Sequence, residues 1–317
     1  MSETQDIATI SRRTFGQLAV ASVIAITTRS NADKTAETSS SGGWIDAHVH
    51  VWTPDVAHYP IDRAFQISDM QPGSFTPEEL FANCKPVGVE RIVLIQMSFY
   101  GLDHRFMFHA MRSHPGVFSA VGLIDYRAAN VIEQADRLAS AGVRGFRLHS
   151  HGDAKEWVDD LGMAKLWKHA GESRLAICPL INPEDIPHIE SLCAKFPETT
   201  VVVDHFARIG VSGSIDKAQL ESLCRLAKFP QTYVKTSAFY ALGKKQSPYD
   251  DLAPMIRRVL DAFGPERMMW ASDCPYQVQG NHTYEASIAL IRDRLEFLSD
   301  VDKKWILRRT AEKVFFG

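Results

Sequence analysis

The sequence predicts one large domain with the (β/α)8 barrel fold, and three observations lead to that prediction. From residue 44 onward, eight short apolar runs alternate with segments of helical spacing. The apolar runs are nearly unbroken, which is typical of parallel strands that are buried on both faces. Eight such units fit into about 270 residues, the usual size of a closed barrel. An open doubly wound sheet is disfavoured, because it normally carries a glycine-rich loop after its first strand, where His-Val-Trp stands here.

The predicted elements follow one another in a regular order. The strands are expected at residues 44–52, 91–98, 118–125, 143–149, 175–181, 200–206, 232–238 and 267–273. The helices are expected at residues 76–86, 106–113, 128–141, 159–172, 187–196, 218–229, 249–263, 284–298 and 302–315. Local signals support these limits, since Thr76 before Pro77 is an N-cap signature and Gly142 stands where a helix should end.

Composition excludes several classes of protein. The net charge is −3 and no basic stripe with interleaved aromatic residues occurs, so nucleic acid is not an expected partner. The five cysteines are dispersed without a Cys-x-x-Cys pair, which argues against a disulfide framework and a structural zinc site. We expect a small-molecule substrate, and the sequence leaves the oligomeric state open.

Residues 1–32 resemble a twin-arginine export signal. Ser-Arg-Arg-Thr-Phe-Gly at residues 11–16 precedes a mildly apolar run and Ser-Asn-Ala at residues 30–32, whose small side chains suit a signal peptidase. The apolar run of about a dozen residues is too short for a stable membrane span, which needs roughly 20 residues. Residues 33–43, rich in Ser, Thr and Gly, are expected to form a flexible linker to the domain at residues 44–317. We expect a periplasmic or secreted protein, or a cytoplasmic one if the leader is not functional.

Polar side chains gather at the carboxyl ends of the predicted strands, where the active sites of this fold lie. They are His48, His50, Arg147, His149, Asp204, His205, Lys235 and Asp273. Each has a structural explanation when it is taken alone, such as a hydrogen-bonded core histidine or a snorkelling lysine, but their joint placement favours an active site. Because side chains alternate along a strand, Asp46 is also expected on the face that carries His48 and His50.

Several of these motifs resemble the amidohydrolase superfamily. The resemblance lies in Asp-Ala-His-Val-His at residues 46–50, in His205 after Val-Val-Val-Asp, and in Trp-Ala-Ser-Asp-Cys-Pro at residues 270–275. Gly-Phe-Arg at residues 145–147, Val-Lys-Thr-Ser at 234–237 and the ending Ala-Glu-Lys-Val-Phe-Phe-Gly are similar to the amidohydrolase-related branch. That branch contains sugar lactonases and 2-pyrone-4,6-dicarboxylate lactonase. The resemblance spans residues 44–317.

The resemblance implies a hydrolase of carboxylic esters, with a lactone as the first choice of substrate. Asp273 would activate the water as general base, and the implied catalytic set is Asp273, His205, His48 and His50. An acidic or sugar-derived substrate would be bound by Arg147, Lys235 and His149.

The resemblance also implies at most one divalent metal ion, with zinc as the first choice. Its ligands would be His48, His50, Asp273 and His205. No bridging lysine or glutamate of a binuclear site is evident at the ends of strands four and five. Because some lactonases of the branch work without a metal, a metal-independent enzyme remains open.

Two other reactions also remain open, namely metal-dependent decarboxylation and hydrolysis of a C–N bond. Decarboxylases of the superfamily carry a histidine at the end of strand five, which residues 175–181 lack. A binding protein without activity is disfavoured, since a binder has no need of a general base. The loops at residues 53–73 and 149–157 are expected to set the specificity.

Overall fold

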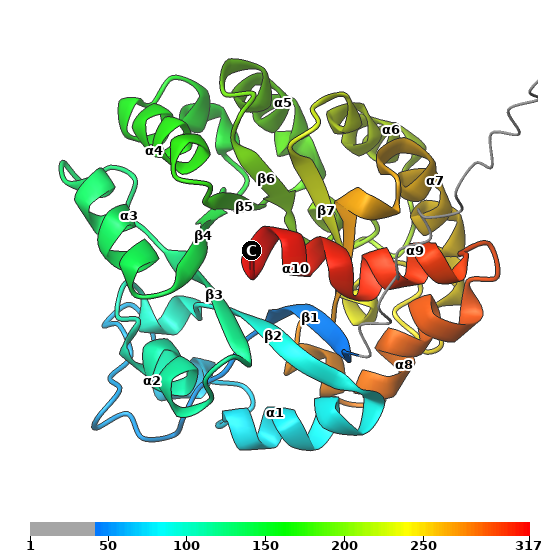
Figure 1. Cartoon of the computed structure of the whole chain (residues 1–317), viewed down its shortest axis with the longest axis horizontal. Helices are drawn as coiled ribbons and strands as arrows, with labels where there is room; N and C mark the ends of the chain where they lie inside the picture. The colour runs from blue at the N-terminus through cyan, green and yellow to red at the C-terminus, as the bar shows by residue number, and fades with distance from the viewer. Residues whose placement is uncertain (1–41) are drawn as a thin grey trace, which may run out of the picture. The chain divides into compact units, whose positions relative to one another are not determined.

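The computed structural model describes residues 42–317. The predicted export signal and all but the last two residues of the predicted linker lie outside the described residues. The described chain forms a sheet of eight parallel strands that lie side by side in chain order. An isolated parallel bridge between Val49 of the first strand and Cys274, three residues after the last strand, links the two edges, so that the sheet forms a nearly closed barrel (Figure 1). The predicted (β/α)8 barrel is confirmed.

All eight predicted strands are present. They are β1 (Trp44–Val49), β2 (Val89–Ile95), β3 (Phe118–Leu123), β4 (Val143–His149), β5 (Ala176–Leu180), β6 (Thr200–Val203), β7 (Thr232–Ser237) and β8 (Met268–Ala271). The predicted ends of β6 and β8 were too long, because the chain turns into left-handed backbone at His205 and at Asp273. Both turns lie at the carboxyl ends of the strands, where the predicted site residues are.

The helices surround the strands. They are α1 (Pro77–Cys84), α2 (Arg105–Ser113), α3 (Val131–Ser140), α4 (Leu161–Glu172), α5 (Ile186–Lys195), α6 (Lys217–Arg225), α7 (Ala253–Phe263), α8 (Tyr284–Ala289), α9 (Asp300–Lys304) and α10 (Thr310–Phe315). A π-helical segment continues α8, and another joins α9 to α10, where the sequence predicted uninterrupted helices. The predicted N-cap is present, since the Thr76 side chain accepts a hydrogen bond from the Glu79 backbone N–H.

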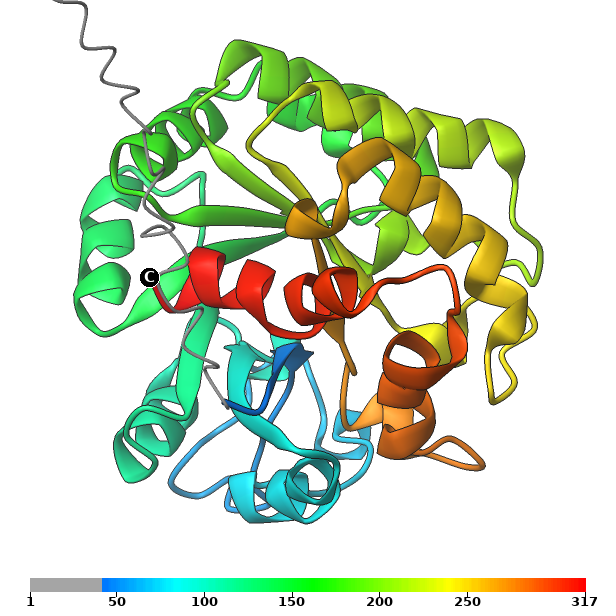
Figure 2. The same ribbon diagram turned by 45° about the vertical axis from the view of Figure 1, so that its right-hand side comes forward.

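The amino end of the barrel is closed by α10. Ala311 and Phe315 pack among the buried side chains that fill the barrel interior, such as Ile45 and Tyr233. The Ser119 hydroxyl, near the start of β3, donates a hydrogen bond of 2.6 Å to the backbone oxygen of Phe315. Figure 2 shows α10 lying across this end. A cavity that admits a substrate therefore has to open at the carboxyl end.

A β-bulge in β1 decides which of its side chains face the barrel interior. Asp46 pairs with Ile92, and Val49 pairs with Leu94, so β1 has one residue more than β2 over the same length. Two successive side chains, those of Ala47 and His48, therefore point inward, and the alternation changes phase at this point.

Asp46 consequently lies behind the sheet, on its outer face, where the helices pack. Its carboxylate accepts hydrogen bonds from the backbone N–H of Ser272 (2.9 Å) and from the hydroxyl of Tyr284 in α8 (2.5 Å). Burial raises the pKa of Asp46 to about 6, although these hydrogen bonds oppose the shift. The prediction that Asp46 shares a face with His48 and His50 was therefore wrong, because the bulge has no local signal in the sequence.

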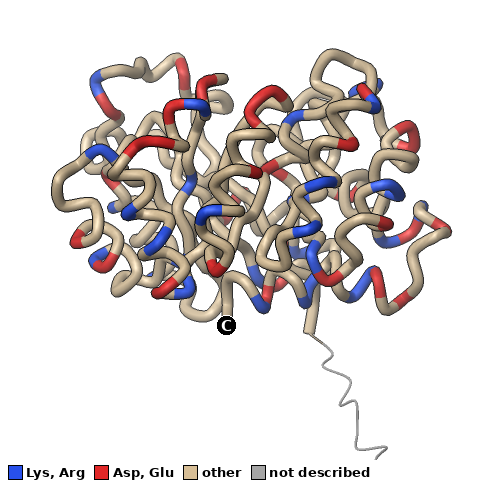
Figure 3. Tube along the Cα trace, turned by 90° about the horizontal axis from the view of Figure 1, so that it is seen from above, with Lys and Arg blue, Asp and Glu red and all other residues tan. Residues whose placement is uncertain are grey.

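The surface of the described residues carries both signs of charge. Figure 3 shows Lys and Arg interspersed with Asp and Glu along the chain. Within residues 42–317, no helix is both long enough and apolar enough to cross a membrane. All five cysteines are buried and unpaired.

Candidate active site

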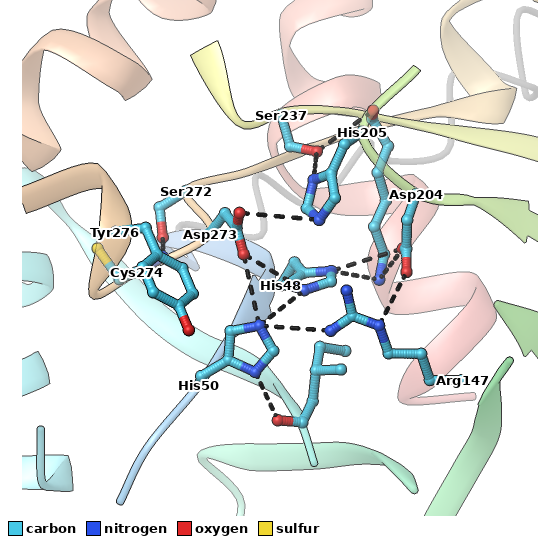
Figure 4. Close-up of polar contacts among 12 residues, drawn as sticks. His48, His50, Arg147, Asp204, His205, Ser237, Ser272, Asp273, Cys274 and Tyr276 are labelled. Atoms are coloured by element: carbon cyan, nitrogen blue, oxygen red, sulfur yellow. Dashed lines mark hydrogen bonds and ion pairs between the residues drawn. The ribbon is translucent and has the colours of Figure 1, made fainter. Parts of the chain in front are cut away.

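Three predicted site residues from the first and last strands meet at the carboxyl end of the barrel. The Nε2 atoms of His48 and His50 are 3.2 Å apart, and each lies 3.5 Å from Oδ1 of Asp273 (Figure 4). The backbone fixes this approach, because the Asp273 N–H donates to the His48 carbonyl (2.9 Å) and the His50 N–H donates to the Cys274 carbonyl (2.8 Å). The two histidines and the carboxylate therefore form one buried unit.

A left-handed turn after β6 adds His205 to this unit. The four residues from His205 to Arg208 have φ between 51° and 60°, although none of them is glycine. Such backbone costs about 1–2 kcal/mol per residue and persists only where the surroundings enforce it, as at functional sites. His205 Nδ1 lies 2.8 Å from the Ser237 hydroxyl, and His205 Nε2 lies 3.8 Å from Oδ2 of Asp273.

A fully buried ion pair lies beneath the histidines. Lys235 Nζ is 2.9 Å from Oδ1 of Asp204, and both side chains have no exposed surface. The ammonium group also lies 3.0 Å from Nδ1 of His48, so it donates a hydrogen bond to that nitrogen. The sequence placed Lys235 beside the substrate, but in the structure Lys235 does not line the cavity. Its contacts are with Asp204 and His48 instead.

A cavity of about 480 Å³ opens above these residues. Of the predicted site residues, those lining it are His50, Arg147, His149, His205 and Asp273. The remaining lining residues are Met97, Ser98, Leu180, Asn182, Arg208, Val211, Ala238, Tyr240, Ala241, Leu242 and Tyr276. Arg208 and Tyr240 were not predicted from the sequence. Arg208 lies three residues after His205, beyond the end of β6, and Tyr240 lies three residues after Ser237, beyond the end of β7. Both residues stand beyond the apolar runs that define the strands, so the sequence pattern did not single them out.

Two arginines face the cavity in different settings. Arg147 Nη1 lies 3.4 Å from His50 Nε2, and its Nε lies 3.8 Å from the carboxylate of Asp204. Arg208 donates a hydrogen bond of 3.3 Å to the side-chain oxygen of Asn182. Within residues 42–317, no carboxylate lies within 4.0 Å of Arg208. Burial, and then the charge of Arg147, lower the pKa of Arg208, so an anion beside it would relieve an unfavourable environment.

His149 enters the cavity from the end of β4. Its ring lies against that of His151, with 3.9 Å between centroids, and burial lowers the pKa of His149 to about 4. The loop that follows is held by the buried Asp185, which accepts hydrogen bonds from the Ser150 hydroxyl (2.6 Å) and the Ala154 backbone N–H (3.0 Å). His149 therefore projects from an anchored loop.

The balance of burial and neighbouring charges lowers the pKa values of Asp273, His48 and His205. Burial alone would raise the pKa of Asp273, but His205, His50 and His48 outweigh burial and hold that pKa well below its usual range. Burial, helped by Lys235, holds the pKa of His48 well below its ordinary value, and burial lowers the pKa of His205 to about 4. A carboxylate that is deprotonated at neutral pH is available to accept a proton.

The spacing of the donor atoms suits one metal ion. The ligand atoms of His48, His50 and Asp273 are 3.2–3.5 Å apart, and tetrahedral zinc with bonds of about 2.0–2.1 Å needs roughly 3.3–3.4 Å between ligands. His50 has the usual second partner of a metal ligand, because its Nδ1–H donates to the Ile95 carbonyl at 2.9 Å.

His48 can serve as a ligand of this ion only if the proton of its neutral ring leaves Nε2. The ammonium of Lys235 donates to its Nδ1, which leaves the proton of the neutral ring on Nε2, the atom that would have to bind the metal. The carboxylate of Asp204, 3.5 Å from Nδ1, can accept an N–H there once the proton has moved. The donor set therefore fits one ion when His48 gives up its Nε2 proton.

Fold and site together define a class of enzyme: a (β/α)8 barrel with histidines in β1, after β1 and after β6, gathered around an ionised carboxylate after β8, below a cavity at the carboxyl end. The chain belongs to the amidohydrolase family, whose sequence profile matches residues 45–317.

Curated relatives cover most of the barrel. An L-fucono-1,5-lactonase of Burkholderia ambifaria is 26% identical over 246 residues, which are 75% of this chain and 82% of that protein. A 2-pyrone-4,6-dicarboxylate hydrolase of Comamonas testosteroni is 28% identical over 254 residues, covering 76% and 79%. An amidohydrolase of Burkholderia multivorans, solved with bound zinc, superposes with a TM-score of 0.70 at 21% identity, over 86% of this chain and 99% of that one. This last likeness shows the shared fold.

Proposed function

We propose that the protein hydrolyses a lactone that carries at least one acidic group. The observation that carries the proposal is the cavity in which the ionised Asp273 and the cation Arg208, which has no carboxylate partner within residues 42–317, line the same space. The two relatives described above, a lactonase and a hydrolase of a pyrone dicarboxylate, support the same reaction class.

Asp273 is the general base in this proposal. A water molecule beside its carboxylate loses a proton to it and attacks the ester carbonyl carbon, and the proton returns to the ring oxygen as the ester bond breaks. His205 and Arg147 line the cavity beside Asp273, and we assign to them the stabilisation of negative charge on the carbonyl oxygen.

His48 and His50, with Asp273, would hold one divalent ion, zinc as first choice, and His205 lies next to this set. When bound, the ion would polarise the carbonyl and activate water. Without an ion, these side chains still surround Asp273 and maintain its low pKa.

The net charge of the side chains at the site indicates the charge of the substrate. The cations Lys235, Arg147 and Arg208 exceed the carboxylates Asp204 and Asp273 by one, and the pKa values of His48 and His205 are lowered. An acidic group on the substrate balances this excess, and the guanidinium of Arg208 offers it a planar pair of donors. His149, neutral at pH 7, would complete this end of the cavity as a hydrogen-bond partner.

Decarboxylation has less support than hydrolysis. At the end of β5 the cavity is lined by Leu180 and Asn182, and neither is a metal ligand of the imidazole type. C–N hydrolysis uses the same general base and is separated from lactone hydrolysis by substrate choice alone.

The test is a pH-indicator assay on aldonolactones, pyrone carboxylate lactones and the corresponding amides, with CO2 release measured in parallel. Faster hydrolysis of acidic lactones than of neutral lactones of the same ring size supports the proposal. If the protein hydrolyses no lactone, CO2 release would identify it as a decarboxylase, and amide hydrolysis would identify it as a C–N hydrolase. Parallel assays on chelator-treated and metal-reconstituted protein show whether the ion contributes.

We also propose export by the twin-arginine route, on the motif at residues 11–16. The mature protein should then begin after Ala32 and be found in the periplasm or medium. Replacing both arginines by lysine should leave the uncleaved chain in the cytoplasm.

A further inference from the structure

Tyr240 makes the shortest polar contact of the proposed general base. Its hydroxyl donates a hydrogen bond of 2.7 Å to Oδ2 of Asp273, whereas His48 and His50 lie 3.5 Å from Oδ1 and His205 lies 3.8 Å from Oδ2. None of the sequence motifs described above includes this tyrosine.

The backbone after β7 is shaped to bring the tyrosine there. Ser237 at the end of β7 pairs with Ala271 of β8, so residues beyond these two positions lie on adjacent strand ends. Ala238 then adopts left-handed backbone, with φ 57°, although it is not glycine, and a short 3-10 turn (Phe239–Ala241) follows. This turn directs Tyr240 toward Asp273, whose own φ is 66°. Two strained positions therefore support one hydrogen bond.

The two oxygens of the Asp273 carboxylate have different surroundings. Oδ1 is directed at the two β1 histidines, as Figure 4 shows. Oδ2 accepts a hydrogen bond from the Tyr240 hydroxyl, so one lone pair of Oδ2 is already in use. The tyrosine hydroxyl is therefore not available to donate to a ligand. The ring of Tyr240 is fixed in turn against Tyr276 and His282, with centroids 6.4 and 6.1 Å away.

We propose that Tyr240 is a positioning residue that assigns separate tasks to these oxygens: Tyr240 holds Oδ2, and in the metal-free site Oδ1 is thereby left to take the proton from water. In that step the water O–H bond breaks, an Oδ1–H bond forms, and the hydroxide electron pair attacks the carbonyl carbon. The inference rests on the proposed lactone hydrolysis and extends it, because it names the oxygen that acts and the group that selects it.

The test compares Tyr240→Phe with wild type on esters whose leaving groups range from alkyl alcohols to phenols. Tyr240→Phe keeps the ring and its packing, so we expect a folded protein. The kcat should fall by about 10- to 100-fold, the factor worth one hydrogen bond to a charged group, with KM within about twofold. The loss should be equal for all leaving groups, because the base acts before the ester bond breaks. Tyr240→Gln, which retains a donor, should recover part of kcat.

The matched control is Tyr100→Phe. This variant also removes the hydroxyl of a buried tyrosine, but that hydroxyl accepts a hydrogen bond of 3.2 Å from the Thr53 backbone N–H and lies outside the cavity. We expect kcat of the control to stay close to wild type. An unchanged kcat in Tyr240→Phe, a rise in KM alone, or a loss confined to poor leaving groups would each overturn the positioning role.

A crystal structure of Tyr240→Phe separates this inference from the proposed function. If wild type hydrolyses no lactone, the proposed function fails, but the orientation of Asp273 in the variant is still observable. A rotated or disordered carboxylate supports the positioning role of Tyr240. A carboxylate in its wild-type place contradicts it.

Discussion

Lys235 and Asp204 form an ion pair of 2.9 Å with no solvent exposure, directly beneath His48. Arg147 approaches the same carboxylate at 3.8 Å. Removing two charges from water is costly, so such a pair is stable only while both partners are present. The pair therefore supports the histidines from below and ties β6 to β7.

The first prediction concerns this pair. Lys235→Met should lower the free energy of unfolding by roughly 3–5 kcal/mol, because Asp204 is then left as a buried charge without its nearest partner. Combining Lys235→Met with Asp204→Asn removes both charges and should recover much of that loss. Urea unfolding of the single and double variants gives the coupling between the two side chains. Losses that simply add would show that the ion pair contributes nothing.

The second prediction concerns metal binding. The ammonium of Lys235 favours a proton on Nε2 of His48, the atom that an ion requires, so the lysine and the ion compete for that ring. The Lys235→Met variant, which keeps Asp204 to accept the Nδ1–H of His48, should therefore bind zinc more tightly than wild type, by roughly tenfold or more. Isothermal titration of the metal-free proteins with zinc measures this directly. Equal or weaker zinc binding would show that Lys235 does not oppose the ion.

The third prediction concerns Asp273. Asp273→Asn removes the proposed base and should lower kcat by roughly 100- to 10,000-fold. KM should change little if the carboxylate acts on water and not on the bound ester. The surface variant Asp103→Asn, which removes one carboxylate that pairs with Arg105, serves as control. Retention of more than about a tenth of wild-type kcat in Asp273→Asn would require another base.

The eight strands and the positions of the site residues could be predicted from the sequence for a physical reason. Parallel strands buried on both faces are largely apolar, so polar residues that directly follow such a run indicate the end of the strand. Asp273 and His205 were found in this way. The rule depends on local composition alone and needs no knowledge of tertiary contacts.

The remaining features depend on contacts that composition does not encode. The bulge that turns Asp46 behind the sheet arises from pairing with β2. The left-handed turn at residues 205–208 contains no glycine that would have indicated it. In the sequence Lys235 looks no different from an exposed lysine. Its burial depends on the ion pair with Asp204, which is distant in the sequence. Tyr240 lies beyond the end of its strand, where the periodicity that defined the strand has ended.

The fourth prediction concerns Arg208. Arg208→Gln should raise KM for an acidic lactone by about 10- to 100-fold, the value of one hydrogen bond between charged groups, and leave KM for a neutral lactone within about twofold. Arg127→Gln, which removes a guanidinium from an exposed pair with Glu156, is the control. Arg147→Met, assayed beside it, shows whether Arg147 affects KM, kcat or both. An equal rise in KM for both lactones would assign Arg208 to the structure of the cavity and not to substrate charge.

The last prediction concerns pH and follows from His149. Its pKa is about 4 in the folded protein and about 6.5 when it is free in the unfolded chain. Between these values the unfolded chain binds a proton that the folded chain does not, so the free energy of unfolding falls as the pH is lowered through this window and is unaffected above it. His149→Gln removes this proton, and its stability should decline less steeply between about pH 7 and pH 5.

Other groups titrate in the same window, so the comparison with wild type is what isolates His149. His205 acts with the same sign, whereas Asp46, whose pKa is raised to about 6, acts with the opposite sign. Both remain in wild type and variant and cancel in the difference. Urea midpoints measured at several pH values for wild type, His149→Gln and the exposed control His58→Gln give that difference. If His149→Gln and wild type show the same pH dependence, His149 is protonated in the folded protein as readily as in the unfolded chain, and the neutral hydrogen-bond role assigned to it in the cavity would have to be given up.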